Sequence, residues 1–204
     1  MTGERFLVAP LLGMTGNREY NPPVAAARAN PDVVIFMGSD SDWSVMARAA
    51  QVLEEFGVTH EAIVSSAHRT HDRTARMAKR FMARGTRVFI AGAGAAAHLA
   101  GVLAAVTPRP VIGVPLASSP LAGFDSLLST AQMPSGVPVA CMAIGEAGAR
   151  NAAILAVEIL ALSDRRLERK LESYREALER EVVAQDARLQ REGRQGATRG
   201  KVEP

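Results

Sequence analysis

The hexapeptide Ser65-Ser66-Ala67-His68-Arg69-Thr70 follows an apolar run, His60–Val64, that predicts a buried strand, and it precedes a helical pattern that begins near Thr70. It places a histidine, an arginine and hydroxyls at the carboxyl end of a strand, where open α/β sheets bind their ligands. His68 can exchange a proton near neutral pH, and the planar guanidinium of Arg69 matches phosphate or carboxylate oxygens. In the alternative interpretation, His68 only caps the helix and Arg69 is a solvated residue of its first turn.

The segments around this hexapeptide repeat the order of strand and helix. Each further strand is predicted from a short apolar run, typical of a parallel strand that is covered on both faces: 33–37, 88–91, 111–114 and 139–142. Helical patterns occur between and after these strands, at 42–56, 70–84, 125–130 and 147–162. This order predicts an α/β fold with a central parallel sheet, right-handed crossovers and helices on both faces.

A second polar stretch, Gly38-Ser39-Asp40-Ser41-Asp42-Trp43, follows the strand at 33–37. The glycine allows close approach of a ligand to the backbone, and the amides of a helix that starts near Asp42 attract anions, so a phosphate fits here. A carboxylate in this position commonly accepts hydrogen bonds from ribose hydroxyls. The structural alternative is that Ser41 or Asp42 serves only as a helix N-cap.

A loop of small residues, Gly92 to Leu99, follows the strand at 88–91 and can lie flat against a substrate. Gly92, Gly94 and Ala97 match the spacing of a dinucleotide fingerprint, but no acidic residue follows before Asp125, so we do not expect NAD. His98 would meet His68 if both lie at the same edge of the sheet. More often, a histidine in such a place is a satisfied interior residue.

Composition limits the function classes. A chain of 204 residues with 48% hydrophobic residues suits one core, and 4% aromatic residues argue against a base-stacking surface for nucleic acid. Residues 163–204 hold 11 of the 24 Lys and Arg and 9 of the 21 Asp and Glu, so the basic charge is interspersed with acid. Cys141 is the only cysteine, which excludes an intrachain disulfide and fits a reducing compartment.

No secretion or membrane segment is expected. The apolar run from Phe6 to Met14 imitates a signal peptide, but Pro10 interrupts it and a polar segment follows. The run from Ala91 to Val106 is short for a bilayer and contains His98. We therefore expect a cytoplasmic protein with neither a membrane nor a nucleic-acid partner.

The expected organisation has four parts. Residues 1–31 form a flexible N-terminal extension, residues 32–162 the catalytic α/β domain, and residues 193–204 a disordered tail. Between them, residues 163–192 form a charged helix with a narrow apolar stripe of Leu167, Leu171, Tyr174 and Leu178. Such a stripe predicts docking on the domain or on another subunit.

The motifs of this chain resemble those of the class I N5-carboxyaminoimidazole ribonucleotide mutases, the PurE family of de novo purine (IMP) biosynthesis. The resemblance runs in order from about Val33 to about Leu178. Two departures are visible, since Ala95 stands where the family usually has glycine and Ala100 where it usually has proline. The matching stretches are 37–43, 66–70, 91–94, 96–99, 132–134, 136–139, 143–145, 148–149 and 151–152.

This resemblance implies a flavodoxin-like three-layer αβα sandwich, with the C-terminal helical extension packed on a neighbour in a homo-octamer. It implies an isomerase that moves the carboxyl group of N5-carboxyaminoimidazole ribonucleotide from N5 to C4, giving 4-carboxy-5-aminoimidazole ribonucleotide. It also implies that the reaction needs no ATP, metal or organic cofactor.

The resemblance further implies a role for each matching residue. His68 looks like the catalytic proton shuttle. Ser39, Ser66 and Arg69 look like phosphate ligands, Asp42 looks like the ribose partner, and Ser41 lines the same pocket. The wall around the aminoimidazole is expected from Gly92, Gly94, Ala96, His98 and Leu99.

Three other interpretations stay open. The nearest is the class II carboxylase, which joins free carbon dioxide to aminoimidazole ribonucleotide, although the Ala96-Ala97-His98 loop resembles class I. A non-enzymatic flavodoxin-like module fits poorly: a receiver needs an acidic phosphoacceptor where this chain has Ala91-Gly92, and a flavin carrier usually has aromatic faces. The third is an inactive paralogue, which Ala95 and Ala100 weakly suggest.

Overall fold

The computed structural model describes residues 30–199, with side chains as far as residue 191. The N-terminal extension expected at 1–31 therefore lies almost wholly outside the described residues, as does the end of the tail. The chain divides into two compact units, one that ends at Leu160 and one that starts at Ala161. Each unit is described here by itself.

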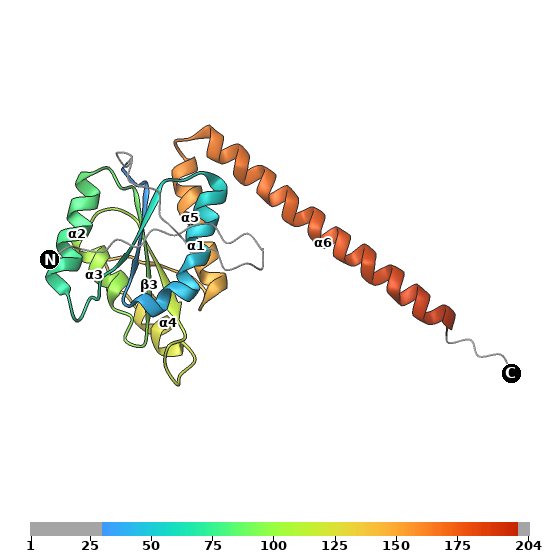
Figure 1. The fold of residues 1–204 in the computed structure, drawn as a ribbon, viewed down its shortest axis with the longest axis horizontal. Helices are drawn as coiled ribbons and strands as arrows, with labels where there is room; N and C mark the ends of the chain where they lie inside the picture. Colours follow the sequence, from blue (N-terminus) through green and yellow to red (C-terminus); the bar gives the residue numbers. More distant parts are fainter. Residues whose placement is uncertain (1–29, 200–204) are drawn as a thin grey trace, which may run out of the picture. The chain divides into compact units, whose positions relative to one another are not determined.

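The first unit is built on a parallel sheet of five strands in the order β2-β1-β3-β4-β5. Its central strand, β3, is labelled in Figure 1. All residues of β1 and of β4, which flank the central β3, are buried, as expected for apolar strands covered on both faces. This strand order is that of flavodoxin-like folds, so the predicted fold class is confirmed. The strands are β1 (Val33–Met37), β2 (His60–Val64), β3 (Val88–Gly94), β4 (Val111–Leu116) and β5 (Ala140–Cys141).

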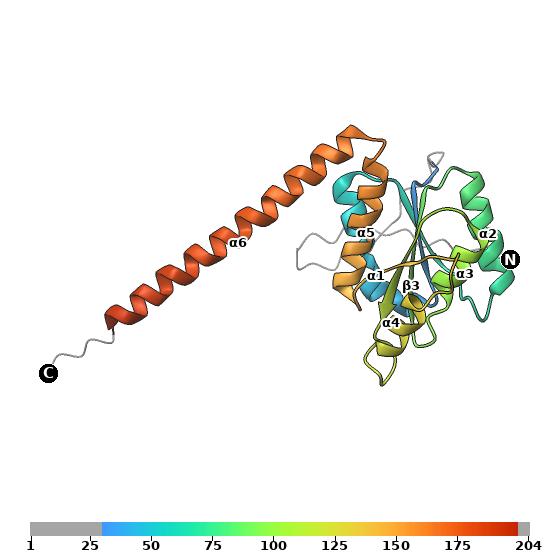
Figure 2. The ribbon, with the colours of Figure 1, turned by 180° about the vertical axis from the view of Figure 1, so that it is seen from behind.

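Helices cover both faces of this sheet. Helices α1 and α5 lie on one face and α2 and α3 on the other, as the two opposite views show (Figures 1 and 2). On the side of α2 and α3, Phe36 and Phe89 pack with ring centroids 5.9 Å apart, within a continuous apolar core. The helices are α1 (Trp43–Phe56), α2 (His71–Ala83), α3 (Leu99–Val106), α4 (Phe124–Ala131) and α5 (Glu146–Ala161), and a short 3₁₀ turn, η1 (Asp40–Asp42), precedes α1.

The third strand is longer than the sequence predicts. We expected a loop from Gly92 onward, but β3 continues to Gly94 because Gly92, Ala93 and Gly94 pair with Val114, Pro115 and Leu116 of β4. Parallel pairing uses backbone groups, so small side chains do not prevent it. Two of the expected wall residues, Gly92 and Gly94, are thus held in the sheet and not in a loop.

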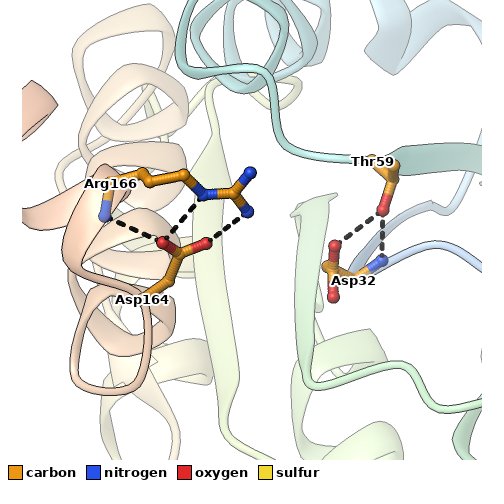
Figure 3. Close-up of polar contacts among 4 residues, drawn as sticks. All are labelled: Asp32, Thr59, Asp164 and Arg166. Atoms are coloured by element: carbon orange, nitrogen blue, oxygen red, sulfur yellow. Dashed lines mark hydrogen bonds and ion pairs between the residues drawn. The ribbon is translucent and has the colours of Figure 1, made fainter.

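Two polar residues, Asp32 and Thr59, are hydrogen-bonded at the edge of the sheet where the strands begin (Figure 3). Thr59 Oγ1 donates to Asp32 Oδ2 at 2.7 Å and accepts from the Asp32 amide at 3.0 Å. The pair ties the residue before β1 to the residue before β2, so it fixes the register of these strands far from their carboxyl ends.

The second unit is dominated by α6 (Arg165–Arg199). Asp164 precedes it and accepts from the Arg166 amide at 2.8 Å and from the Arg166 guanidinium at 3.0 Å (Figure 3). These hydrogen bonds lower the pKa of Asp164 to about 2. The helix continues to Arg199, whereas the glycine at 193 predicted an earlier end. None of the helices in the described part of the chain has the length and apolar character to cross a membrane.

Candidate active site

Three polar loops leave the carboxyl ends of three neighbouring strands. One loop follows β1, one follows β2 and one follows β3, and β1 pairs with both of the other strands. Since all three strands are parallel, the loops lie at one edge of the sheet, which is the edge where such folds bind ligands. This is the arrangement that the sequence predicts for its candidate site residues.

The loop after β1 forms a compact turn around Ser39 and Asp42. Ser39 is the N-cap of η1, and the Asp42 carboxylate accepts from the Ser39 amide at 3.0 Å. The hydroxyl of Ser41 donates to that of Ser39 at 2.9 Å. Asp42 is also the N-cap of α1 but makes no side-chain capping bond to it, so its carboxylate serves this loop instead.

The ionisation of Asp42 reflects two opposing influences. Partial burial raises the pKa of this carboxyl group from 3.8. The amides of Ser39 and Gly38 and the charge of Arg69 oppose that rise, while the neighbouring carboxylate of Asp40 adds to it. A half-buried carboxylate held by backbone amides has a fixed position, which suits a group that accepts hydrogen bonds from a sugar.

The loop after β2 carries Ser66, His68 and Arg69. The Ser66 hydroxyl accepts from the Arg69 amide at 3.2 Å and from Arg69 Nε at 3.3 Å. Arg69 Nη2 also donates to the carbonyl of Gly38 at 2.9 Å. Thr70, not His68, is the N-cap of α2, so the capping role that was the structural alternative for His68 is wrong. Arg69 keeps further donors for an anion beside the loop after β1.

His68 meets His98 across the site. The two rings lie edge to face, with His68 Nε2 2.7 Å from His98 Nδ1. Both side chains are exposed, so neither is a satisfied interior histidine. One of these two nitrogens must carry a proton and donate it while the other accepts, so the hydrogen bond requires complementary tautomers of the two rings. The predicted meeting of the two histidines is confirmed.

The remaining wall residues differ in accessibility. Ala96 is exposed beside His98, whereas Leu99 is only 1% exposed and packs in the apolar core as the first residue of α3. Any contact of Leu99 with a ligand would thus come from its backbone or follow a rearrangement. Ala95, just before Ala96, adopts the left-handed backbone conformation with φ of 50°, which a glycine would adopt more easily.

Two contributors to the site, Met46 and Ser118, were not singled out from the sequence, and a third, the carbonyl of Gly38, has a role that the sequence did not predict. The carbonyl of Gly38 receives Arg69, Met46 packs where a side chain at Gly92 would project, and Ser118 lies directly over Gly94. Met46 lies in α1 and Ser118 follows β4. Periodicity alone marks Met46 as core, and no local signal marks Ser118. Their roles depend on tertiary packing between segments that are distant in the chain.

No metal site is recognisable among the residues that the structure describes, since no three side chains of His, Cys, Asp or Glu are grouped as ligands. Cys141 is partly buried, and burial raises the pKa of its thiol. The donor set of the site consists instead of hydroxyls, amides, a guanidinium and two imidazoles. Such a set binds phosphate and sugar groups and transfers protons.

Comparison with known proteins agrees with this geometry. A mutase from Brucella melitensis, named N5-carboxyaminoimidazole ribonucleotide mutase, is 55% identical over 146 residues, covering 72% of this chain and 90% of the relative. A protein of the same name from Thermotoga maritima is 52% identical over 163 residues, covering 80% and 94%. The crystal structure of Treponema denticola PurE superposes with a TM-score of 0.71 at 30% identity, covering 77% of this chain and 97% of that one.

The match to a family model covers most of the unit that carries the site and extends into α6. The model is that of AIR carboxylase, and it matches residues 32–181. It includes all three polar loops and the whole sheet. The chain therefore belongs to the AIR carboxylase family.

Proposed function

We propose that this protein is an N5-carboxyaminoimidazole ribonucleotide mutase, an isomerase of de novo purine biosynthesis. The observation that carries the proposal is the placement of His68 beside the Ser66 and Arg69 pair at the end of β2. Such a site offers a proton-transfer group next to an anion-binding group. Relatives that carry this name are 49–55% identical to the chain over most of its length, which supports the same activity here.

The substrate would be held by its phosphate and ribose. The hydroxyls of Ser39 and Ser66 and the guanidinium of Arg69 suit the phosphate, because they offer donors from two adjacent loops. Asp42 suits the ribose hydroxyls as an acceptor, and Ser41 lines the same pocket. The aminoimidazole would then lie toward Gly92, Gly94, Ala96, His98 and Leu99.

The reaction needs a group that first gives one proton to the substrate and later removes one from it. As the bond between N5 and the carboxyl carbon breaks, the imidazolium of His68 gives its proton to N5, and carbon dioxide and aminoimidazole ribonucleotide form. C4 then attacks the carbon dioxide, and neutral His68 removes the C4 proton. His68 thus ends as it began. General acid and base catalysis contributes roughly 10²- to 10⁴-fold, and retention of carbon dioxide beside C4 adds a proximity effect.

The alternative activity is an aminoimidazole ribonucleotide carboxylase that uses free carbon dioxide, and the family as a whole is named for a carboxylase. The loop Ala96-Ala97-His98 favours the mutase by its resemblance to class I. A progress curve by ultraviolet absorbance distinguishes the two. We expect freshly made N5-carboxyaminoimidazole ribonucleotide to be converted to the C4-carboxylated product without ATP or added bicarbonate. Product only from aminoimidazole ribonucleotide and carbon dioxide would refute the mutase.

The proposal extends to assembly and location. We place the mutase in the cytoplasm as a homo-octamer with sites near subunit interfaces, in which the charged helix from residue 163 onward contacts a neighbour. Exposed apolar side chains on both units support contact between copies: Leu121, Phe124 and Leu128 in the first, and Val182 and Leu189 in the second.

A further inference from the structure

Two buried hydroxyls lie directly behind the loop that carries His68 and Arg69. Thr74, in the first turns of α2, is 0% exposed, and Ser65, at the end of β2, is 2% exposed. Their hydroxyl oxygens are 2.8 Å apart. Because a buried hydroxyl costs free energy unless it is hydrogen-bonded, such a pair calls for a reason beyond space filling.

Thr74 reaches both ends of the loop. Its Oγ1 lies 3.4 Å from the carbonyl of Ser66 and 3.2 Å from the carbonyl of Thr70, and these two carbonyls flank the segment Ala67-His68-Arg69. Bonding to the carbonyl four residues earlier is ordinary for a threonine in a helix. The additional contacts with Ser65 and Ser66 are not, because they cross from the helix to the end of the strand.

The loop has other attachments as well: Ala67 packs in the apolar core, and the Thr70 amide donates to the Ser66 carbonyl at 2.9 Å. Among the residues that the structure describes, the side chain of His68 bonds only to His98, which is itself exposed, and the Arg69 side chain bonds to Gly38 and Ser66. Thr70 adds a hydroxyl bond to the Ser66 carbonyl at 2.9 Å. The exposed residues His68 and Arg69 are therefore positioned by the hydrogen bonds at the two ends of the loop together with the packing of Ala67.

The same network extends to the neighbouring strand. The amide of Ser65 donates to the carbonyl of Met37 at 2.8 Å, and Met37 directly precedes Gly38, which receives Arg69. The loops after β1 and β2 are thus linked at the front by Arg69 and at the back by Ser65.

We infer that Thr74 is a positioning residue for His68 and Arg69. Its buried hydroxyl is hydrogen-bonded to the Ser65 hydroxyl and shares its single proton between the two carbonyls that flank the loop. It does not touch the substrate. Its hydroxyl holds the imidazole and the guanidinium at the spacing that the proposed mutase reaction requires, so the kinetic part of the inference rests on the proposed function. Misplacement by about 1 Å can cost about 100-fold in rate.

The test compares Thr74→Val, which keeps the shape and removes the hydroxyl, with Thr74→Ser, which keeps the hydroxyl. The matched control is Thr86→Val: Thr86 is also 0% exposed, and its hydroxyl donates to the Pro31 carbonyl at 2.9 Å, away from the loop. We expect Thr74→Val to lower kcat about tenfold or more, Thr74→Ser to stay within about threefold of the wild type, and Thr86→Val to lower only thermal stability. Wild-type kcat in folded Thr74→Val would overturn the inference.

Crystal structures and a second variant test the inference independently of the activity of Thr74→Val. Crystal structures of Thr74→Val and Thr86→Val should show a displaced Ala67-His68-Arg69 segment in the first variant only, and an unmoved segment in both would refute the inference even without an activity assay. If Thr74→Val does not fold, Ser65→Ala removes the partner hydroxyl, and an unchanged kcat in that variant refutes it equally. A wild-type protein without mutase activity refutes the proposed function alone.

Discussion

The side chain of Arg69 is bonded to the backbone of Gly38, with Nη2 2.9 Å from the carbonyl oxygen. The two residues lie 31 positions apart, one after β2 and one after β1. The contact joins two loops into a single wall, and it orients the guanidinium toward the turn that contains Ser39 and Asp42. A side chain held in this way loses less freedom when it binds a phosphate, which favours tight binding.

Replacing His68 by asparagine tests the proton shuttle. We expect His68→Asn to fold normally, because the side chain is exposed, and to lose nearly all turnover, because asparagine cannot take up or release a proton near neutral pH. The ultraviolet progress curve with N5-carboxyaminoimidazole ribonucleotide measures it. His71→Asn is the control, since His71 is also exposed and is the first residue of α2. Equal turnover in His68→Asn and the wild type would rule out the mechanism.

Asp42 predicts a specific dependence of stability on pH. Its pKa is raised in the folded protein, so the native state binds the proton more tightly than the unfolded chain does. The stability from this group is fully present below the unfolded pKa of 3.8 and is lost as pH rises through the raised folded value. The difference in unfolding free energy between wild type and Asp42→Asn should therefore fall as pH rises across that window.

Urea unfolding at a series of pH values above and below about 4 measures this difference. A difference that increases with pH would show that the hydrogen bonds from the Ser39 and Gly38 amides outweigh burial. Asp42→Asn should also weaken binding of the nucleotide, because the amide is a poorer acceptor than the carboxylate for ribose hydroxyls.

Local patterns in the sequence were sufficient to predict where the strands and the polar loops lie along the chain. The runs at 33–37 and 60–64 became β1 and β2 with the same bounds, and the first is buried throughout, as an apolar run predicts. The expected burial of the second was wrong: β2 is an edge strand in which Ile63 alone is buried. The convergence of the loops follows from parallel strand order alone. For this reason the sequence was enough to predict that the loops that carry Asp42, His68 and His98 lie at one edge of the sheet.

Features that depend on contacts between distant segments could not be predicted. The pairing of Gly92–Gly94 with β4 has no signal in side-chain periodicity, and neither has the position of Ser118 over Gly94. The burial of Leu99 is a similar case: a motif match placed it in the ligand wall, whereas its apolar side chain fills the core. Thr74 gave no signal because a lone threonine in a charged helix is unremarkable.

The left-handed conformation of Ala95 predicts a stabilising substitution. An alanine at φ of 50° costs about 1–2 kcal/mol relative to a right-handed conformation, and glycine avoids this cost but loses some of the gain to the greater entropy of the unfolded chain. We expect Ala95→Gly to raise the free energy of unfolding by up to about 1 kcal/mol without lowering turnover. Chemical denaturation measures it. As control, Ala104→Gly within α3 should lower stability by about 0.5–1 kcal/mol.

Deleting residues 163–204 tests the role of the charged helix in assembly. The cut falls between α5, which ends at Ala161, and α6, which starts at Arg165, so it interrupts no helix. We expect light scattering to give eight copies for the full chain and fewer for the truncated one, because the apolar stripe of α6 is removed. A control that lacks only residues 200–204 should keep eight copies. An unchanged copy number after the longer deletion would contradict the proposed contact.

The close packing of Ser118 against Gly94 can be tested by substitution, because only a glycine fits beneath that serine. A Cβ atom at Gly94 would overlap Ser118 Oγ and lie 2.7 Å from Ser118 Cβ and 3.2 Å from the Leu116 carbonyl. We expect Gly94→Ala to lower stability by about 1–3 kcal/mol and to lower turnover, since the end of β3 must shift. Ser118→Gly in the same chain removes the overlapping atoms and should restore most of both losses.

A double-mutant cycle by chemical denaturation and progress curves measures this coupling. Gly101→Ala is the control, because its added Cβ meets only the flexible end of Met133, at 3.3 Å, and alanine favours the helix there. It should change stability by less than about 1 kcal/mol and leave turnover unaltered. Additive effects of the substitutions at Gly94 and Ser118 would mean that the two residues do not share this space in solution, and that the loop after β4 does not shape the site.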